Sequence, residues 1–408
     1  MAEKPLQKYR VLDMTRVLAG PWCTQNLADL GAEVIKVERP LVGDETRGWG
    51  PPWLPSGQDG PRPDSAYFGS ANRGKKSITI DFTLPQGQEL IRELARHCDV
   101  LVENYRFGTL ARYGLGYEDL KAINPRLVYC SVTGFGQSGP YRDKPGYDFV
   151  FQAMSGLMSI TGERDELPGG GPQKVGIAVA DITTGMYATV AVTSALLWRE
   201  GSGQGQHLDI SLLDCAMAFN SNQAANYLAS GQLPRRHGNA HSNAVPYQVF
   251  DTSDGRIVVA VGNDALFAAY CHALERPDLC SDERFRKVSA RLAHRDVLLE
   301  QLTRIMAMHS SADWLDRLDA AGVPCAPIND FAQALADPQV QARRIQVDIA
   351  QADGTPFKAI ASPLRFSETP IDYPLGPPLL GEHTQAVLRE HLGLDIASQA
   401  ALRAAGAI

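Results

Sequence analysis

The chain has 408 residues, of which 44% are hydrophobic and 21% are charged. This composition is ordinary for a globular protein and excludes long disordered or low-complexity stretches. The 39 basic and 46 acidic residues give a net charge of −7, which disfavours a nucleic-acid-binding protein. At about 150 residues per domain, the length predicts two or three structural units.

Two features of the sequence bear on the compartment in which the protein resides. The N-terminus lacks an apolar segment of the secretory type, and the most apolar long stretch, from Gly185 to Trp198, is short for a membrane span. Seven cysteines are scattered along the chain without a CxxC pair, which is typical of reduced thiols. We therefore expect a cytoplasmic protein that binds no membrane.

Strand and helix patterns alternate through the first part of the chain. Short apolar runs predict strands at 9–14, 33–38, 99–103 and 126–132. Helical patterns are predicted between and after them, at 20–30, 84–97 and 185–198. The alternation predicts an α/β fold in which helices cover both faces of a parallel sheet.

A parallel sheet of this kind also indicates where a ligand binds. Its ligands lie beyond the carboxyl ends of the strands. The loops that follow Met14, Glu38, Glu103 and Val132 are therefore the expected location of a site.

A second region of the chain begins near residue 226. A strand at 256–261 and helices around 264–275 and 311–321 predict a smaller domain there, and a helix is predicted in the tail at 382–392. The expected organisation is a large domain at 1–200, a linker helix at 201–225, a small domain at 226–325 and a return segment at 326–408 that completes the large domain.

Three motifs that often carry cofactors or metals are absent or weak. The glycines at 134–139 match GxGxxG, but Pro140 and Pro145 follow, so no helix begins there and we interpret the segment as a loop. No GxxxxGK[ST] sequence is present. His237 and His241 have helical spacing, but the Gly-Asn between them disfavours a helix and hence a metal pair.

Basic residues recur near the predicted strand ends and in the loops beyond them. Each alone is typical of a solvated surface, but together they could form an anion site in an otherwise acidic protein, suited to a ligand with several phosphates. They are Arg39, Arg73, Lys75, Lys76, Arg106, Arg112, Arg142 and Lys144.

Asp181 lies just before the predicted apolar helix at 185–198. An aspartate in this position is a good helix cap, and capping is the simpler interpretation. A carboxylate near a helix N-terminus also stays ionised, and an ionised carboxylate can attack an acyl group. The residues alone leave both roles open.

Seven segments along the chain together carry a family resemblance: 11–13 with 19–21, 31–38, 72–77, 102–106, 146–148, 180–181 with Gly185, and 379–384. In this order they resemble the family III CoA-transferases, which include formyl-CoA:oxalate and carnitine CoA-transferases, and the resemblance covers nearly the whole chain. It implies a Rossmann-like large domain, a smaller α+β domain and an interlocked, ring-like homodimer. It also implies transfer of CoA from an acyl-CoA thioester to a carboxylic acid, with no metal and no tightly bound cofactor.

The resemblance further implies roles for individual residues. Asp181 matches the family's nucleophile, which attacks the thioester and passes through aspartyl-anhydride and aspartyl-CoA thioester intermediates. The CoA contacts of the family correspond to Val17, Ala19, Arg39, Asn72, Arg73, Lys75, Asn104, Tyr105, Arg106, Arg112 and Lys144.

Arg16, Tyr147 and Asp148 are the expected substrate contacts. Arg16 stands where the formyl-CoA enzyme has histidine. Its place near the acyl end of the family's site suggests a dicarboxylate acceptor such as succinate or glutarate, and the alternative is that Arg16 holds CoA or a loop. Asp148 corresponds to an acidic residue close to the family's site. Tyr147 stands where the related α-methylacyl-CoA racemases have a catalytic histidine, and a phenol of pKa about 10 replaces imidazole poorly near neutrality.

Two alternatives to a transferase stay open. One is an acyl-CoA racemase or epimerase, and the other is a CoA-binding protein without turnover, in which Asp181 only caps its helix. The acceptor is also open, because the loop at 238–243 has one glycine where the formyl-CoA enzyme has a run of them. This difference argues against an acceptor as small as oxalate.

Overall fold

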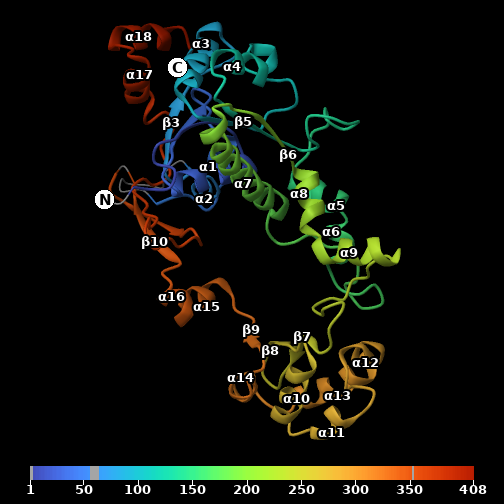
Figure 1. Cartoon of the computed structure of the whole chain (residues 1–408). Helices are drawn as coiled ribbons and strands as arrows, with labels where there is room; N and C mark the ends of the chain where they lie inside the picture. Colours follow the sequence, from blue (N-terminus) through green and yellow to red (C-terminus); the bar gives the residue numbers. More distant parts are fainter. Residues whose placement is uncertain (1–2, 56–63, 352) are drawn as a thin grey trace. The chain divides into compact units, whose positions relative to one another are not determined.

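The computed structural model describes residues 3–55, 64–351 and 353–408 (Figure 1). The chain folds into two compact units, each with its own core. Residues 158–174, which we expected in the large domain, fold with unit 2. Unit 1 contains Met1–Leu157, Val175–Ala225 and Gln339–Ile408, and unit 2 contains Met158–Lys174 and Asn226–Pro338.

Unit 1 is built on a six-stranded sheet whose neighbouring strands are all parallel. The strand order is β3-β2-β1-β4-β5-β6, which is the order of a doubly wound Rossmann sheet. The predicted α/β class and Rossmann-like topology are thus confirmed. The strands are β1 (Arg10–Met14), β2 (Glu33–Glu38), β3 (Lys75–Thr79), β4 (Val100–Glu103), β5 (Val128–Thr133) and β6 (His207–Ser211).

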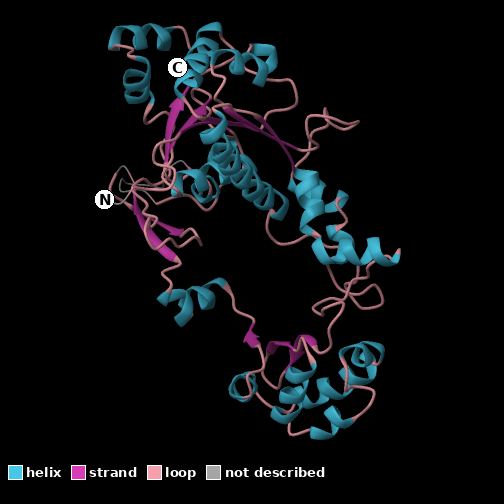
Figure 2. Ribbon diagram, viewed as in Figure 1, coloured by secondary structure: helices cyan, strands magenta, loops and turns pink. Residues whose placement is uncertain are grey.

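Helices cover both faces of this sheet (Figures 1 and 2). Helices α1, α7 and α8 pack on one face, and α3, α4 and α17 pack on the other. Their bounds are α1 (Ala19–Asp29), α7 (Val179–Ser202), α8 (Leu212–Phe219), α3 (Pro85–His97), α4 (Tyr117–Ile123) and α17 (Thr384–Leu392).

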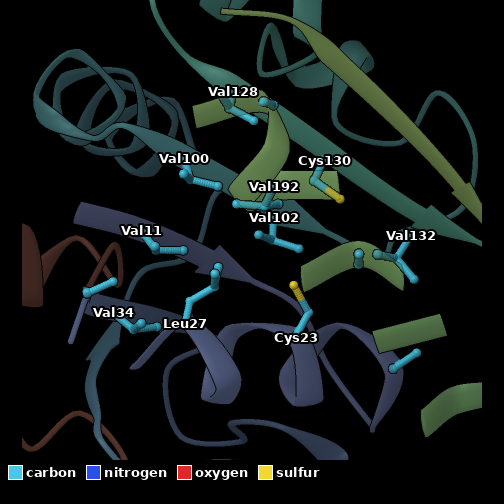
Figure 3. Close-up of a cluster of buried hydrophobic side chains, with 14 of the residues drawn as sticks. Val11, Cys23, Leu27, Val34, Val100, Val102, Val128, Cys130, Val132 and Val192 are labelled. Atoms are coloured by element: carbon cyan, nitrogen blue, oxygen red, sulfur yellow. The ribbon is translucent and has the colours of Figure 1, made fainter. Parts of the chain in front are cut away.

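Successive residues of each central strand serve the two faces in turn. Val11 of β1 points to α1 and α7 with Val100 of β4, as Figure 3 shows, while their neighbours Leu12 and Leu101 belong to the opposite core. Strands that are buried on both faces read as continuous apolar runs, because every side chain meets a helix layer. This is why β1, β2, β4 and β5 could be predicted from the sequence.

The remaining elements of unit 1 are short. A two-stranded antiparallel hairpin, β10-β11, lies in the returning C-terminal segment. Helices α6, α9 and α16 span the boundaries between the two units. The bounds are η1 (Glu45–Gly48), α2 (Ala66–Ser70), η2 (Ala111–Tyr113), α5 (Asp148–Met154), α6 (Leu157–Ile160), α9 (Ser221–Ser230), α16 (Pro338–Ala342), β10 (Gln346–Ala350), β11 (Pro356–Ile360) and α18 (Ile396–Ala404).

Unit 2 has a three-stranded antiparallel sheet, in the order β7-β8-β9, and a helical layer. Its core includes the fully buried rings of Phe267, Phe285 and Trp314. The bounds are β7 (Tyr247–Asp251), β8 (Arg256–Ala260), β9 (Cys325–Pro327), α10 (Asp264–Ala273), α11 (Pro277–Ser281), α12 (Val288–Ala293), α13 (Arg295–Met306), α14 (Ser311–Ala320) and α15 (Phe331–Ala336). Among the described residues, none of the helices combines the length and apolarity that a membrane crossing requires.

Two strands of the sheet escaped prediction because they are polar. In β3, Lys75 and Ser77 are buried, and their polar atoms bind Asp13 of β1 and Glu38 of the adjacent strand β2. Strand β6 occupies part of the segment 201–225, so the single linker helix expected there is wrong. A strand, α8 and the start of α9 take its place.

Helix α7 begins six residues before the apolar stretch that predicted it. Asp181 therefore lies in the first turn of α7 and is not its N-cap residue, which is Ala178. Gly185 lets α7 pack closely on α1, since a Cβ atom at this position would lie 2.7 Å from the carbonyl oxygen of Ala19 and 2.9 Å from Cβ of Trp22. Backbone on both sides leaves little room for adjustment.

We expect Gly185→Ala to lower the free energy of unfolding by about 1–3 kcal/mol through this overpacking. Gly201→Ala is the matched control on α7, because nothing lies within 4 Å of a Cβ atom there. The control should be neutral or stabilising by up to about 1 kcal/mol, since alanine favours a helix over glycine. Denaturant unfolding of the two variants checks the prediction, and equal stabilities would contradict the proposed close packing.

Candidate active site

A cavity of about 280 Å³ lies at the carboxyl end of the sheet. The loops after β1, β4 and β5 line it, together with the first turn of α7 and residues from 142–147. Strand order reverses between β1 and β4, and this switch point is where open α/β sheets bind ligands. The lining residues are Arg16, Val17, Leu18, Ala19, Glu45, Asn104, Tyr105, Arg106, Phe107, Val132, Thr133, Gly134, Arg142, Lys144, Pro145, Gly146, Tyr147, Asp181 and Leu212.

Buried charges fix the loop between β1 and α1. Asp13 is fully buried and pairs with Lys75 at 3.0 Å, and it accepts hydrogen bonds from the backbone and hydroxyl of Thr15 at 2.9 and 2.5 Å. Lys36 donates to the carbonyl of Thr15 at 2.9 Å and pairs with Asp44 at 3.0 Å. These bonds hold both polar groups of the Thr15 backbone, so the loop is fixed directly before Arg16, the first lining residue of the cavity.

The next two residues of this loop are held in place as well. Val17 has a positive φ of 69°, a strained conformation for a β-branched residue. The side chain of Asn104 accepts a hydrogen bond from the Arg16 N–H at 2.9 Å and donates one to the Arg16 carbonyl at 2.7 Å. The hydrogen bonds from Asn104, which directly follows β4, thus fix the backbone beside the strained Val17, which lines the cavity.

The guanidinium of Arg16 lies in the cavity with a single acidic partner. It pairs with Glu45 at 2.9 Å and lies 5.1 Å from the centre of the Tyr105 ring. Its Nε is buried and has no hydrogen-bond partner in the described parts of the chain. Both members of the ion pair keep about a third or more of their side chains exposed (43% and 34%), so the pair is open to exchange.

Asp181 borders the same cavity from the first turn of α7. The residue is only 8% exposed, and the N-cap residue Ala178 has no side-chain acceptor to offer the helix. Asp148 supplies this acceptor from α5, because its Oδ1 accepts hydrogen bonds from the N–H groups of Ala180 at 2.7 Å and Asp181 at 3.3 Å. Gln152 holds the other oxygen of Asp148 at 2.6 Å. Asp148 therefore caps the helix that carries Asp181.

Burial and, as a smaller contribution, the charge of the neighbouring Asp148 together raise the pKa of Asp181 to about 7. The expectation that the helix end keeps this carboxylate ionised in the ordinary way is therefore wrong, since Asp148 takes the backbone donors. A carboxylate with a pKa of about 7 is more basic than an ordinary one and is half ionised near neutrality.

We expect Asp181→Asn to stabilise the protein increasingly as pH rises. The pKa of Asp181 is raised from 3.8 in the unfolded chain to about 7 in the folded one, so the folded state loses stability as pH rises through this window. The neutral amide removes that loss, and its advantage should grow by about 2–3 kcal/mol between pH 5 and pH 8. Denaturant unfolding at both pH values checks this, and an advantage that does not change with pH would contradict the raised pKa.

The structure brings together most of the predicted site residues. Val17, Ala19, Asn104, Tyr105, Arg106, Lys144, Arg16, Tyr147 and Asp181 line the cavity, and Asp148 contacts the backbone of Asp181. Arg39 and Arg112 are exposed and lie outside the lining set. Tyr147 is 63% exposed, although it also lines the cavity.

Asn72, Arg73 and Lys75 are buried, and their side chains are occupied elsewhere. Arg73 pairs with Asp29 at 2.6 Å, Lys75 pairs with Asp13, and Asn72 donates to the carbonyl of Phe68 at 2.9 Å. A CoA contact at 72–75 would therefore fall to the backbone, and this part of the assignment stays a prediction.

The sequence analysis did not identify some residues in or near the cavity as candidates. Glu45 partners Arg16, and Phe107 lies under the guanidinium of Arg142 at 4.5 Å. Tyr67 is electrostatically close to the site, since burial and then the charges of Asp181 and Asp148 raise its pKa to about 12. Phe107 lies in the loop that follows β4, so the rule on strand ends could have found it, whereas nothing local marks Glu45 or Tyr67. Among the described residues, no group of three or more acidic, histidine or cysteine side chains could hold a metal ion.

Comparisons with known proteins agree with this architecture. The sequence model of CoA-transferase family III matches residues 6–384. A succinate–glutarate CoA-transferase of Agrobacterium fabrum is 47% identical over 386 residues, which cover 95% of each chain. A succinyl-CoA:glutarate CoA-transferase of Homo sapiens is 41% identical over 99% of this chain and 90% of its own. A solved CaiB/BaiF family protein from Brucella suis, 47% identical, superimposes with a TM-score of 0.83 over 95% of this chain and 99% of its own.

Proposed function

The chain belongs to CoA-transferase family III and is a CoA-transferase, and we propose that it passes CoA from an acyl-CoA such as succinyl-CoA to a dicarboxylic acid such as glutarate. The observation that carries the proposal is the buried Asp181, whose pKa is about 7, at the wall of a cavity that also holds Arg16. The names of the relatives that are 41–47% identical support the choice of acids.

The first half of the reaction converts the donor thioester into an enzyme-bound thioester. Ionised Asp181 attacks the thioester carbonyl, the C–S bond breaks, and the products are an aspartyl–acyl anhydride and CoA thiolate. The thiolate then attacks the aspartyl carbonyl, which releases the donor acid as a carboxylate and leaves an aspartyl-CoA thioester.

The second half of the reaction runs in the opposite sense with the acceptor. The acceptor carboxylate attacks the aspartyl thioester and expels CoA thiolate, so that a second anhydride forms. The thiolate attacks the acyl carbonyl of this anhydride, which yields the new acyl-CoA and regenerates the Asp181 carboxylate. One thioester replaces another, so the exchange needs neither ATP nor a change of oxidation state.

Asp148 positions the nucleophile without contacting the reacting atoms. It holds the N–H groups of Ala180 and Asp181, and this fixes the first turn of α7. Its charge also helps to raise the pKa of Asp181, which makes the ionised form a stronger nucleophile.

We assign the phosphates of CoA to basic residues that remain accessible. Arg39, Arg106 and Arg112 are exposed, and no ion pair with an acidic residue occupies them among the described residues. Lys144 lines the cavity and lies 3.8 Å from the centre of the Tyr141 ring. Guanidinium groups that are free of carboxylates suit phosphate binding, because their forked donors match its oxygens.

A homodimer and a cytoplasmic location are also part of the proposal. Helix α7 leaves apolar side chains exposed along its outer face, among them Val190 at 58% and Leu197 at 77%, and a second copy of the chain would cover them. All seven cysteines are free, which fits a reducing compartment.

We expect Asp181→Ala to abolish CoA transfer while leaving CoA affinity within about twofold of the unsubstituted protein, because only the nucleophile is removed. Succinyl-CoA and a panel of carboxylic acids measure the transfer, and calorimetry measures CoA binding. Asp214→Ala is the control, since Asp214 is exposed in the first turn of α8 and lies outside the cavity. Near-normal transfer by Asp181→Ala would overturn the mechanism, and α-proton exchange with deuterated solvent in the absence of any acid would instead indicate a racemase.

The acceptor prediction rests on the exchangeable pair of Arg16 and Glu45. If the remote carboxylate of a dicarboxylic acid binds Arg16, Arg16→Met should lower kcat/KM for glutarate by about 10- to 150-fold, the equivalent of about 1.5–3 kcal/mol. Butyrate, which lacks the second carboxylate, should lose far less. Glu45→Gln should have the opposite effect and lower the KM for glutarate, because it removes the competing carboxylate. Equal losses for both acids in Arg16→Met would assign Arg16 to CoA or to the loop.

A further inference from the structure

Unit 2 contains a second cavity, of about 350 Å³, which the transfer chemistry proposed above does not use. It lies between the segment 163–167, the loop after α9, the strand β7 and the first two turns of α13. All of these belong to unit 2, so the cavity is formed within one compact unit. Its lining residues include Glu163, Arg164, His237, Asp251, Arg256, Arg295 and the apolar side chains Leu167, Val249, Phe250 and Leu299.

The charges around this cavity do not balance. Asp251 is taken by Arg256 at 2.7 Å, and Glu163 lies 3.8 Å from Arg164. Arg295 has no acidic partner among the described residues, and its guanidinium donates only to the carbonyls of His241 and Ser242, at 2.8 and 3.0 Å. The lining of the cavity thus holds three arginines and two carboxylates, while two further carboxylates outside the lining, Glu166 and Asp296, act on Arg164 and Arg295.

The position of Arg295 adds to this positive potential. It is the first residue of α13, where the helix dipole is already positive and a basic side chain is unfavourable. Two backbone carbonyls hold the guanidinium in this place. Asp296 in the same turn offsets part of this positive charge, and an anion bound beside Arg295 would offset the rest.

The pKa of His237 is affected by the same positive charges. Burial lowers its pKa below the usual value, and the charges of Arg295, Arg164, Arg235 and His241 lower it further. The carboxylate of Glu163 also lies near this loop, since it would be 2.6 Å from a Cβ atom at Gly238, and it offsets only part of the positive charge. An anion in the cavity would reverse the field and favour the protonated imidazole.

We propose that this cavity of unit 2 is a binding site for a small organic carboxylate, which Arg295, Arg164 and His237 hold by its anionic end. The size of the cavity falls in the range of small-molecule sites. Guanidinium groups bind carboxylates and phosphates alike, but the apolar wall of Leu167, Val249 and Leu299 suits the hydrocarbon part of an organic acid. The site goes beyond the proposed transfer reaction and does not depend on it.

Titration calorimetry of the full chain with glutarate tests the site. All variants carry Arg16→Met, so that binding to the cavity of unit 1 is weakened equally. Arg295→Gln should weaken glutarate binding by about 10- to 100-fold, the usual range for loss of one charged hydrogen bond. Arg304→Gln is the matched control, because it removes the same charge from α13 at a residue that pairs with Glu300 and lies outside the cavity.

A second variant and a measurement of proton uptake on binding distinguish loss of the site from misfolding of Arg295→Gln. Arg164→Gln changes an exposed side chain whose acidic contacts are both long, at 3.8 Å, and it should also weaken binding. Titrations at pH 7 in buffers of different ionisation enthalpy should show proton uptake on binding, and affinity should rise as pH falls. His237→Gln should remove this proton uptake.

The outcomes separate the possible ligands. Glutarate affinity that is equal in Arg295→Gln, Arg164→Gln and Arg304→Gln would overturn the site. Inorganic phosphate that binds as tightly as glutarate, with the same dependence on Arg295, would overturn the assignment to an organic acid. CoA transfer is measured separately, so a failed transfer assay leaves this test intact.

Discussion

Two carboxylates lie at the N-terminus of α7, and the backbone N–H groups there donate hydrogen bonds to only one of them. Asp148 takes the N–H groups of Ala180 and Asp181, which leaves Asp181 buried beside a like charge. The pKa of about 7 follows from that division, since burial and repulsion both favour the protonated form. An aspartate in the first turn of a helix thus becomes an unusually basic carboxylate at the wall of a cavity, and the proposed chemistry depends on this arrangement.

The rest of unit 1 keeps that cavity in shape through charges that are buried in pairs. Burial opposes the ionisation of Asp13, but the charges of Lys75 and Lys36 outweigh it and lower the pKa of Asp13. For Lys75 the balance differs, because burial lowers its pKa to about 8 against the pull of Asp13. Removal of one member of such a pair leaves an unpaired buried charge, which is far more costly than the pair itself. The loop after β1 therefore has little freedom to change when a substrate enters.

The sequence predicted the parts of the fold in which burial and apolar character coincide. Strands β1, β2, β4 and β5 are buried on both faces and read as apolar runs, and the strand-end rule led from them to the loops that line the cavity. Strand β3 is equally buried but contains Lys75 and Ser77, whose partners come from strands distant in sequence. No local pattern reveals a lysine that is buried because an aspartate 62 residues earlier faces it. The start of α7 was missed for a similar reason, because its cap comes from α5.

The same limit applies to the basic residues of the first half. The sequence identified them as a group but could not show which of them stabilise the fold and which remain accessible to a ligand. In the structure five of them form two classes that differ in burial. Arg73 and Lys75 form buried ion pairs with Asp29 and Asp13 and stabilise the fold. The exposed class has no acidic partners among the described residues and consists of Arg39, Arg106 and Arg112. A buried pair cannot exchange its partner for a ligand without leaving a charge unpaired, while an exposed guanidinium gives up only water. Acidic partners, more than the basic residues themselves, thus decide which positive charges remain for an anionic substrate.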